Sequence, residues 1–370
     1  MVYIAIIFLF INSSLNSMEA PAENTIIENH YNNPAINPTD IVMIMPTLMD
    51  HAHYNTHALM ALMYYRVYYY FAFEKDSYES LINPLKQIDW NYLDLSFFKN
   101  NQPETPTDHL FWGIQYLFKK MNNHNNNEHQ RIIEHFSIAA QSDPRAMYLL
   151  GNIYETKNDE FRSFFWLNKS QDQGFIPGLF LTALSYMHGY GQLPNHKKGF
   201  MMLLKAARSG FAPAQCLTAD YYAKYLSNSK DVTKSWYHKA ATACYIPAYF
   251  RFGKYLLKET QSEQEFSIAI NLLEIATDHN DANAQCELGI YYQNQSEAAA
   301  RKLGIKYLKQ AYSNGHKQAS FILARNYIEH KTNKQTLGFA IMNNLASQGY
   351  LRAQNYLSYD AQTRAVIIPE

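Results

Sequence analysis

Three histidines near the start of the chain have a spacing that metal sites use. His51, His53 and His57 form an H-x-H-x3-H pattern, and His53 and His57 would share one face of a helix. A closed zinc site needs a fourth ligand, and Asp50 is the only acid close by in the sequence. We therefore interpret these histidines as polar residues at a helix start, and we predict no metal and no cofactor.

Ser227 and Lys230 match the S-x-x-K pattern of serine acyl-enzymes. The sequence holds neither the Ser-Asp-Asn nor the Lys-Thr-Gly motif of those enzymes, and no G-x-S-x-G, C-x-x-C or Gly-rich phosphate loop. We therefore predict a solvated turn, no catalytic residue and a protein that is not an enzyme. The alternative is a hydrolase or metal-dependent enzyme with its site in residues 41–100 and the rest of the chain as a docking module.

The 30 tyrosines have another use, because tyrosine is over-represented at the energetic centres of protein interfaces. Most of them fall on the repeating pattern described below, and we therefore predict that these tyrosines pack in the core. Four lie off this pattern and are our candidates for contact with a partner: Tyr190, Tyr225, Tyr245 and Tyr249.

Charge and composition limit the classes of partner. The 32 basic and 32 acidic residues cancel, so we predict no nucleic-acid partner, although a local basic patch is compatible with this balance. A hydrophobic content of 47% is ample for a core. Cys216, Cys244 and Cys286 are too few for a disulfide framework, and we expect free, mostly buried thiols.

The first residues contain an apolar run from Val2 to Ile11, about half the length that crosses a bilayer as a helix. We interpret residues 1–17 as a signal peptide, which predicts a secreted or periplasmic protein without a membrane span in the mature chain. The competing interpretations are an uncleaved anchor and a cytoplasmic protein that starts at Met18.

Two segments separate this run from the repeats. Residues 18–40 are polar, rich in Asn and without apolar periodicity, which predicts a disordered linker. Residues 41–107 are rich in aromatic residues, and the stretch from His57 to Phe73 is apolar on nearly every face. We expect a helical region there, with the 57–73 helix as the N-terminal cap of the repeats.

The chain then repeats with a period of about 35 residues. Five positions into each unit stands a Gly or Ala, and three further on a large residue, which is Tyr in all but one unit. A small residue lets a partner helix approach, and the large ring fills the space beside it. The units start at Asp108, Ala146, Gly178, Ala214, Ala248, Ala284 and Ala319, with a truncated unit at Ala353.

A second helix is expected in each unit, centred on Trp166, Met202, Trp236 and their equivalents. Eight residues later come Gly174, Gly210, Asn280, Gly315 and Gly349, which suit a left-handed residue that ends a helix. Cys244 occupies the same place, so we expect that helix end to differ from its neighbours.

These residues resemble the Sel-1-like repeat (SLR), a relative of the tetratricopeptide repeat. The resemblance covers about Asp108 to Leu357. It is carried in the first helix by Ala284, Gln285, Leu288, Gly289 and Tyr292, and in the second by Trp236, Tyr237, Lys239, Ala240 and Ala241.

The resemblance implies an all-α fold, a right-handed superhelix of about seven helix pairs, followed by a tail at 358–370. It also implies a non-catalytic adaptor that binds a protein or peptide along its concave face, exported by a bacterium for an envelope or host-interaction role. Such a stack leaves no obvious place for a catalytic pocket.

Overall fold

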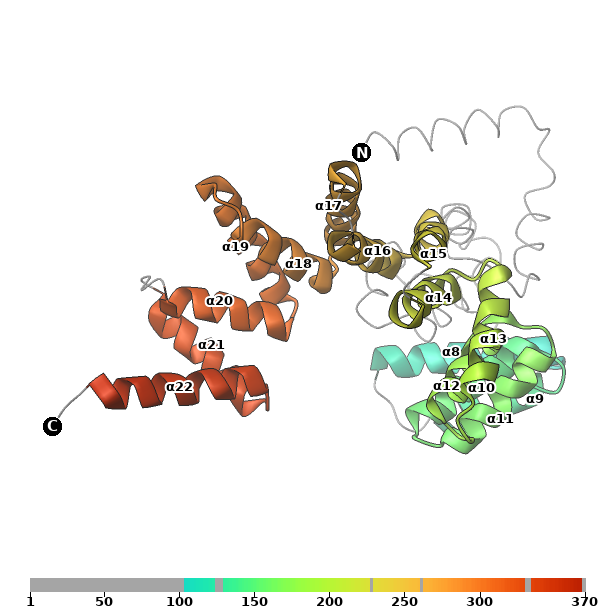
Figure 1. Ribbon diagram of the computed structural model, residues 1–370. Coiled ribbons are helices and arrows are strands. Elements are labelled where there is room, and N and C mark those ends of the chain that lie inside the picture. Colours follow the sequence, from blue (N-terminus) through green and yellow to red (C-terminus); the bar gives the residue numbers. More distant parts are fainter. Residues whose placement is uncertain (1–102, 124–128, 227–228, 260–261, 330–333, 368–370) are drawn as a thin grey trace, which may run out of the picture. The chain divides into compact units, whose positions relative to one another are not determined.

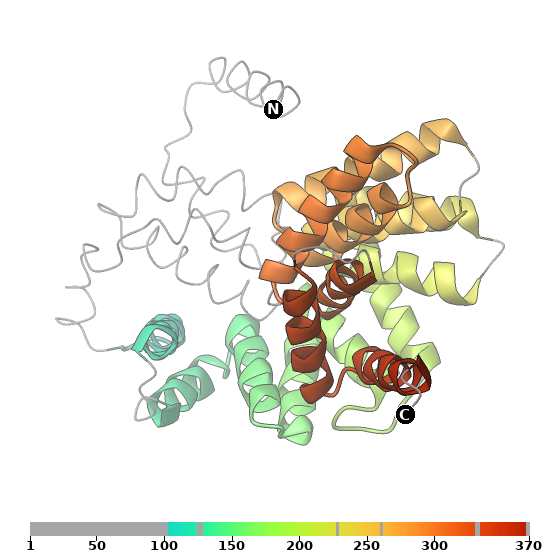
Figure 2. The ribbon, with the colours of Figure 1, turned by 90° about the vertical axis from the view of Figure 1, so that its left-hand side faces the viewer.

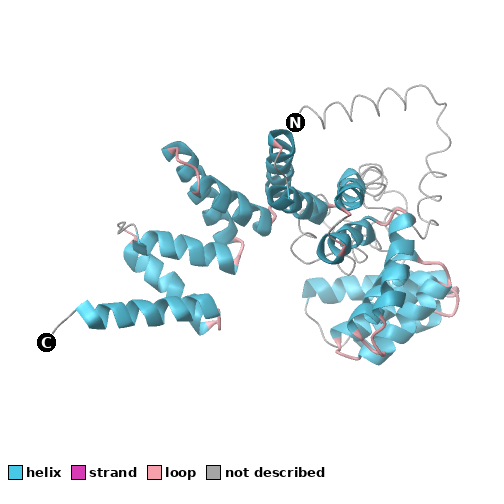
Figure 3. Ribbon diagram, viewed as in Figure 1, coloured by secondary structure: helices cyan, strands magenta, loops and turns pink. Residues whose placement is uncertain are grey.

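The computed structural model describes residues 103–123, 129–226, 229–259, 262–329 and 334–367, and every regular element in these ranges is a helix (Figures 1 and 3). The signal peptide, the linker and the 57–73 helix expected from the sequence lie outside the described residues. The fifteen described helices are α8 (Pro106–Asn123), α9 (His129–Ala139), α10 (Pro144–Thr156), α11 (Glu160–Asp172), α12 (Ile176–His188), α13 (His196–Arg208), α14 (Ala212–Tyr225), α15 (Lys230–Thr242), α16 (Ile246–Glu259), α17 (Glu263–Asp278), α18 (Ala282–Gln293), α19 (Ala298–Ser313), α20 (Lys317–Glu329), α21 (Gln335–Ser347) and α22 (Leu351–Ile367).

First and second helices of a pair alternate along the chain, and each first helix begins two residues before the unit start expected from the sequence. In most pairs the first helix packs against its own second helix. That second helix then packs against the first helix of the next pair. The pairs therefore stack in chain order, and the predicted all-α solenoid of helical repeats is confirmed. The chain divides into two compact units within α14, between Thr218 and Ala219. Figure 2 shows the α16–α21 pairs of the second unit from the side.

The last helix is longer than the sequence suggested. We expected the repeats to end near Leu357 and a tail to follow, but α22 runs on to Ile367. The stretch from Ser358 to Ile367 contains neither Gly nor Pro, so nothing in it interrupts a helix that has already begun.

The small residues of the first helices lie where the second helix comes closest. A methyl group added to Gly151 would lie 2.6 Å from Leu167 Cγ, and one added to Gly289 would lie 2.7 Å from Leu308 Cγ. Both distances are too short for carbon atoms in contact, so only a small residue fits. Ala183, Ala219 and Ala324 hold the same position in other pairs and are fully buried.

A second row of small residues, which the sequence analysis missed, lies opposite on the second helices. Methyl groups added to Gly199, Gly304 and Gly338 would each lie 2.8 Å from a backbone oxygen of the facing first helix. Here backbone meets backbone, so no side chain can move aside. The equivalent residues of the other pairs are buried and small: Ser163, Thr233 and Ala269.

The second helices end as the sequence predicted. The glycines at this position have φ between 77° and 88°, and Asn280 has φ 63°. The next N–H then bonds back across the helix end, as from Phe211 N to Ala206 O at 3.2 Å. This pattern satisfies a carbonyl that the helix leaves unpaired and turns the chain into the next first helix.

Our expectation for Cys244 was wrong. Its φ is 53°, and the N–H of Tyr245 bonds to Ala240 O at 3.2 Å, so this helix ends as its neighbours do. The stacking of successive pairs fixes the turn, and the backbone adopts the left-handed conformation although a Cβ opposes it.

Glycine should therefore fit this position better than any residue with a Cβ. We expect Cys244→Gly to unfold with a free energy about 1 kcal/mol higher than Cys244→Ala, because glycine alone escapes the left-handed penalty. The alanine variant is the matched control, since both variants lose the thiol. Equal denaturant midpoints for the two variants would show that no backbone penalty exists at this position.

The closest helix contact gives a second prediction. Gly304→Ala should lower the free energy of unfolding by about 1 to 3 kcal/mol, although alanine is the better helix former, because the added methyl would lie 2.8 Å from backbone atoms. Lys306→Ala on the exposed side of the same helix is the control and should change little. A Gly304→Ala protein as stable as the wild type would contradict the packing described above.

Candidate interaction surface

The structure describes only one of the residues singled out for enzyme or metal chemistry. His51, His53, His57 and Ser227 lie outside the described residues. Lys230 begins α15 and pairs with Glu259 at 3.2 Å. Across the described ranges no three His, Cys, Asp or Glu side chains lie close enough together to hold a metal ion. The cysteines are free thiols.

The four candidate tyrosines do not form one site. Tyr190 lies in the α12–α13 loop, 49% exposed, and stacks on His188 with ring centroids 5.4 Å apart. Tyr225 ends α14 and is 60% exposed, with Lys224 Nζ 5.0 Å from its ring centroid. Both present an accessible ring to solvent, but they belong to different compact units.

The other two tyrosines belong to the core. Tyr245 is only 6% exposed, because it follows the left-handed Cys244 and points inward as Phe175 and Phe211 do after their glycines. The aromatic residue at the same place in three units was the signal that could have shown this. Tyr249 is half-buried, packs on the Leu273–Leu288 cluster, and has its pKa raised, first by burial and then by the Cys244 thiol.

In the second compact unit, successive first helices contact each other at one repeated register. Positions are counted from the unit starts given above. The residue six positions after the start of one unit contacts the residue three positions after the start of the next unit. Arg251 Nη1 of α16 lies 2.5 Å from Asp220 Oδ2 of α14, and Lys254 Nζ lies 2.5 Å from Glu287 Oε1 of α18. The next step is apolar, since Ile290 and Ile322 pack on the same cluster. We call these three pairs the first-helix ladder.

A row of tyrosines runs beside this ladder. Tyr221, Tyr255 and Tyr291 hold the same position on α14, α16 and α18 and are half-buried. Each ring packs against another aromatic ring. The ring centroids are 4.8 Å apart for Tyr221 and Tyr225, 5.5 Å for Tyr255 and Tyr237, and 5.3 Å for Tyr291 and Phe266. The rings are held in place and still keep an open side, which suits contact with a partner.

Asp220 ties this face to the core of its pair. Its Oδ1 accepts the hydroxyl of Tyr237 at 2.5 Å while Oδ2 faces Arg251. One carboxylate thus links α14, α15 and α16, and both its oxygens are occupied. Its role is to orient neighbouring helices, because a carboxylate so engaged has little left to offer a ligand.

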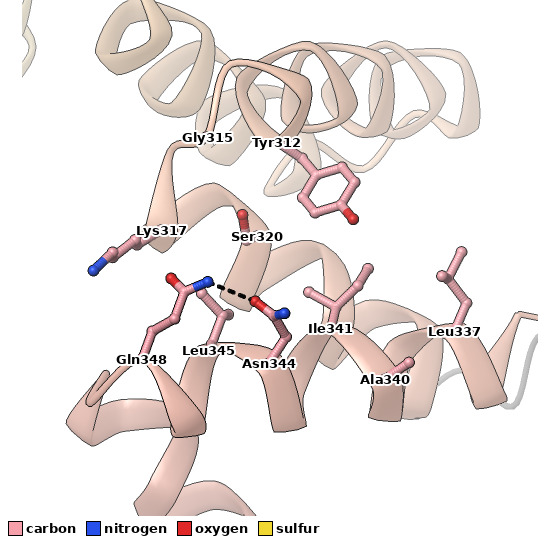
Figure 4. A pocket seen from close by; sticks show the side chains of 10 residues that line it. All are labelled: Tyr312, Gly315, Lys317, Ser320, Leu337, Ala340, Ile341, Asn344, Leu345 and Gln348. Atoms are coloured by element: carbon pink, nitrogen blue, oxygen red, sulfur yellow. Dashed lines mark hydrogen bonds between the residues drawn. The ribbon is translucent and has the colours of Figure 1, made fainter.

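A cavity of about 340 Å³ lies between α19, α20 and α21 (Figure 4). Leu337 and Ile341 form its apolar side, and Lys317 is the one cation among the residues that line it. Gln348 Nε2 donates to Asn344 Oδ1 at 2.7 Å, and Ser320 Oγ donates to His316 O at 2.9 Å. The hydroxyl is therefore engaged, and the lining holds no acid, histidine or cysteine that could activate it.

Two half-buried histidines, His135 and His316, lie where a positive charge would be poorly solvated. Burial lowers the pKa of both below the ordinary value. His135 also faces His109, with their Nδ1 atoms 2.9 Å apart, so that two positive charges there would repel. His316 Nδ1 accepts Ala319 N at 3.1 Å and so caps α20.

Comparison with solved structures shows the fold. A Sel1 repeat protein from Oxalobacter formigenes superposes with a TM-score of 0.51 at 20% identity, covering 62% of this chain and 95% of that one. A protective antigen of uropathogenic Escherichia coli with an SLR fold superposes with a TM-score of 0.55 at 19% identity, covering 81% of this chain and 64% of the antigen. No family model and no curated protein matches the sequence. The chain has the Sel1-like repeat fold, which confirms the resemblance at the level of structure.

The two half-buried histidines predict that acid destabilises the protein. The pKa of these imidazoles is lower in the folded chain than in the unfolded chain. As the pH falls below about 6.5, the unfolded chain therefore binds more protons than the folded chain, and unfolding is favoured. The melting temperature should therefore fall between about pH 7 and pH 5. His316→Asn keeps a capping acceptor, loses the titration and should flatten this slope, whereas His238→Asn at an exposed position should not. An unchanged slope in His316→Asn would contradict this explanation.

Proposed function

We propose that this protein, built on the Sel1-like repeat fold, is a non-catalytic adaptor that holds a protein or peptide segment along the face of its first helices. The observation that carries the proposal is the repeated register of that face. In the second compact unit, each step of the stack presents one ladder pair and one half-buried tyrosine. These contacts recur every 34 to 36 residues of this chain, so a bound segment would meet the same kind of contact at each step.

The chemistry of this face favours association over catalysis. The ladder charges are paired with each other, which leaves the tyrosines as the chief source of contact energy, in keeping with the enrichment of tyrosine at hot spots. Arg325 and Lys258, both exposed, supply charges at the edges of the face. A partner would therefore gain affinity from many modest contacts spread over several helices.

We also propose that the chain is exported by a bacterium, for a role in the envelope or in contact with a host. Support comes from the apolar run between Val2 and Ile11 at the N-terminus. In the described residues no helix is both long and apolar enough to cross a membrane. Fractionation of the producing cells, with mass spectrometry of the N-terminus, tests export: we expect a chain that begins at Met18 outside the cytoplasm, and a chain found only in the cytoplasm would contradict the proposal.

Site-specific photo-crosslinking in the producing cells tests the binding face. A photoreactive amino acid replaces Lys258 of α16 or Arg325 of α20, both on exposed first-helix positions, and we expect each variant to form the same adduct with a single partner. Tyr255→Ala should weaken the adduct about tenfold, as loss of one hot-spot ring does.

The matched controls carry the photoreactive residue at Lys302 or Lys306, on the exposed side of the second helix α19. These positions should give no such adduct. Adducts that form equally from both sides of the stack, or from α19 alone, would contradict binding along the first helices.

A further inference from the structure

The second helices α11 and α13 of the first compact unit carry a face that the adaptor proposal does not use. Ser163 of α11 and Gly199 of α13 hold the same inward position, each facing the first helix of its own pair. Residues two positions away point about 200° around the helix and so face outward. On both helices these outward positions carry large apolar side chains and lysines.

The apolar members are well exposed. Phe161 is 74% exposed and Phe165 is 45% exposed on α11, and Met201 is 58% exposed on α13. The second helices of the other compact unit are polar or small at the position of Phe165 and Met201. The residues there are Ser235, Asn271, Lys306 and Ala340.

The charge on the α13 half of this face has one sign. From Gln173 to Ala219 the chain contains four charged residues and all are basic: Lys197, Lys198, Lys205 and Arg208. The whole chain has a formal net charge of zero, so this segment is a local excess of positive charge.

Most of this charge has no acidic partner within the part of the chain that the structure describes. Lys198 Nζ donates to Tyr186 Oη at 2.6 Å and lies 4.0 Å from its ring centroid. Lys197, Lys205 and Arg208 form no ion pair with any described carboxylate. Lys169, in turn, lies 4.7 Å from the ring centroid of Phe165 and has no acidic partner among the described residues.

The two helices are neighbours across α12. Gly191, in the loop that leads into α13, donates its N–H to Glu160 Oε2 at 3.3 Å, so this loop lies on the first turn of α11. A methyl group on Gly191 would overlap the Glu160 carbonyl, which fixes the approach. Six residues thus form one surface, the basic-apolar face: Phe161, Phe165 and Lys169 from α11 and Lys197, Met201 and Lys205 from α13.

We propose that the basic-apolar face is a second docking surface, which binds an acidic protein segment with apolar anchors. Apolar side chains and lysines follow one another at four-residue spacing along each helix, so a helical partner with carboxylates beside Leu, Phe or Trp complements both properties. A second copy of this chain would meet the same positive charge across a symmetric contact.

Other anionic surfaces fit less well. The apolar side of α13 is buried in the fold, and Met201 is the one exposed apolar residue between Lys197 and Lys205. A helix that lies in a membrane interface needs a larger exposed apolar surface than this. Nucleic acid binding relies on cations along a phosphate backbone, and half of this face is apolar.

Peptide selection on the full-length protein tests the proposal. A displayed library of random peptides is first depleted on the Lys197→Glu/Lys205→Glu variant and then selected on the wild type, so that only peptides requiring this face survive. We expect survivors in which Asp or Glu flanks large apolar residues. Their affinity should fall about tenfold in Phe165→Ala or Met201→Ala, and should weaken with rising salt.

The matched control is Lys302→Glu/Lys306→Glu, the same charge change on the outward side of α19, which should bind the selected peptides as the wild type does. No surviving peptide, survivors without acidic residues, or equal loss in the α19 variant would overturn the proposal. So would phosphatidylserine vesicles or single-stranded RNA that bind the wild type, lose binding in Lys197→Glu/Lys205→Glu and displace the peptides. Failure here leaves the first-helix proposal unaffected, because its crosslinking positions lie on α16 and α20.

Discussion

The structure depends on how closely two helices can approach. Where Gly289 of α18 faces Gly304 of α19, backbone meets backbone, and a methyl group on either residue would overlap its neighbour. This contact brings the large residue beside it, such as Leu308, against the partner helix and buries it completely. Small residues hold this place in successive pairs, and in the second compact unit the pairs stack with one repeated register. The ladder and the tyrosine row follow from that constancy.

Much of this organisation could be predicted from the sequence. The period, the small residue and the ring three positions later located each first helix to within two residues, because packing imposes the same side-chain volumes in every unit. Second helices were harder. Trp166 and Tyr307 drew attention by size, yet they are half-buried, while Leu167 and Leu308 beside them are the core residues. Large residues mark a helix well, but they do not show which side of it faces the core.

The sequence was least informative where one residue type serves two environments. Tyr245 was chosen as an interface residue because it lay off the tyrosine pattern. A second pattern already accounted for it, since Phe175 and Phe211 also follow left-handed residues and are buried. The prediction for Cys244 was wrong for another reason. A residue with a Cβ disfavours the left-handed conformation, but the packing of successive pairs requires that conformation at this helix end. The ladder could not be predicted at all, because its partners come from different pairs and meet only through the register of stacking.

The two faces of the stack differ in how they use charge. The charges of the first-helix ladder pair with each other, so that face offers aromatic rings, whereas the lysines of α13 have no acidic partner among the described residues. The most direct test of the central claim is hydrogen–deuterium exchange of the full chain, alone and bound to the partner recovered by crosslinking. Our explanation predicts protection of the partner-facing helices α16, α18 and α20, with α17 and α19 unchanged. Protection confined to α17 and α19, or no protection of any first helix, would contradict it.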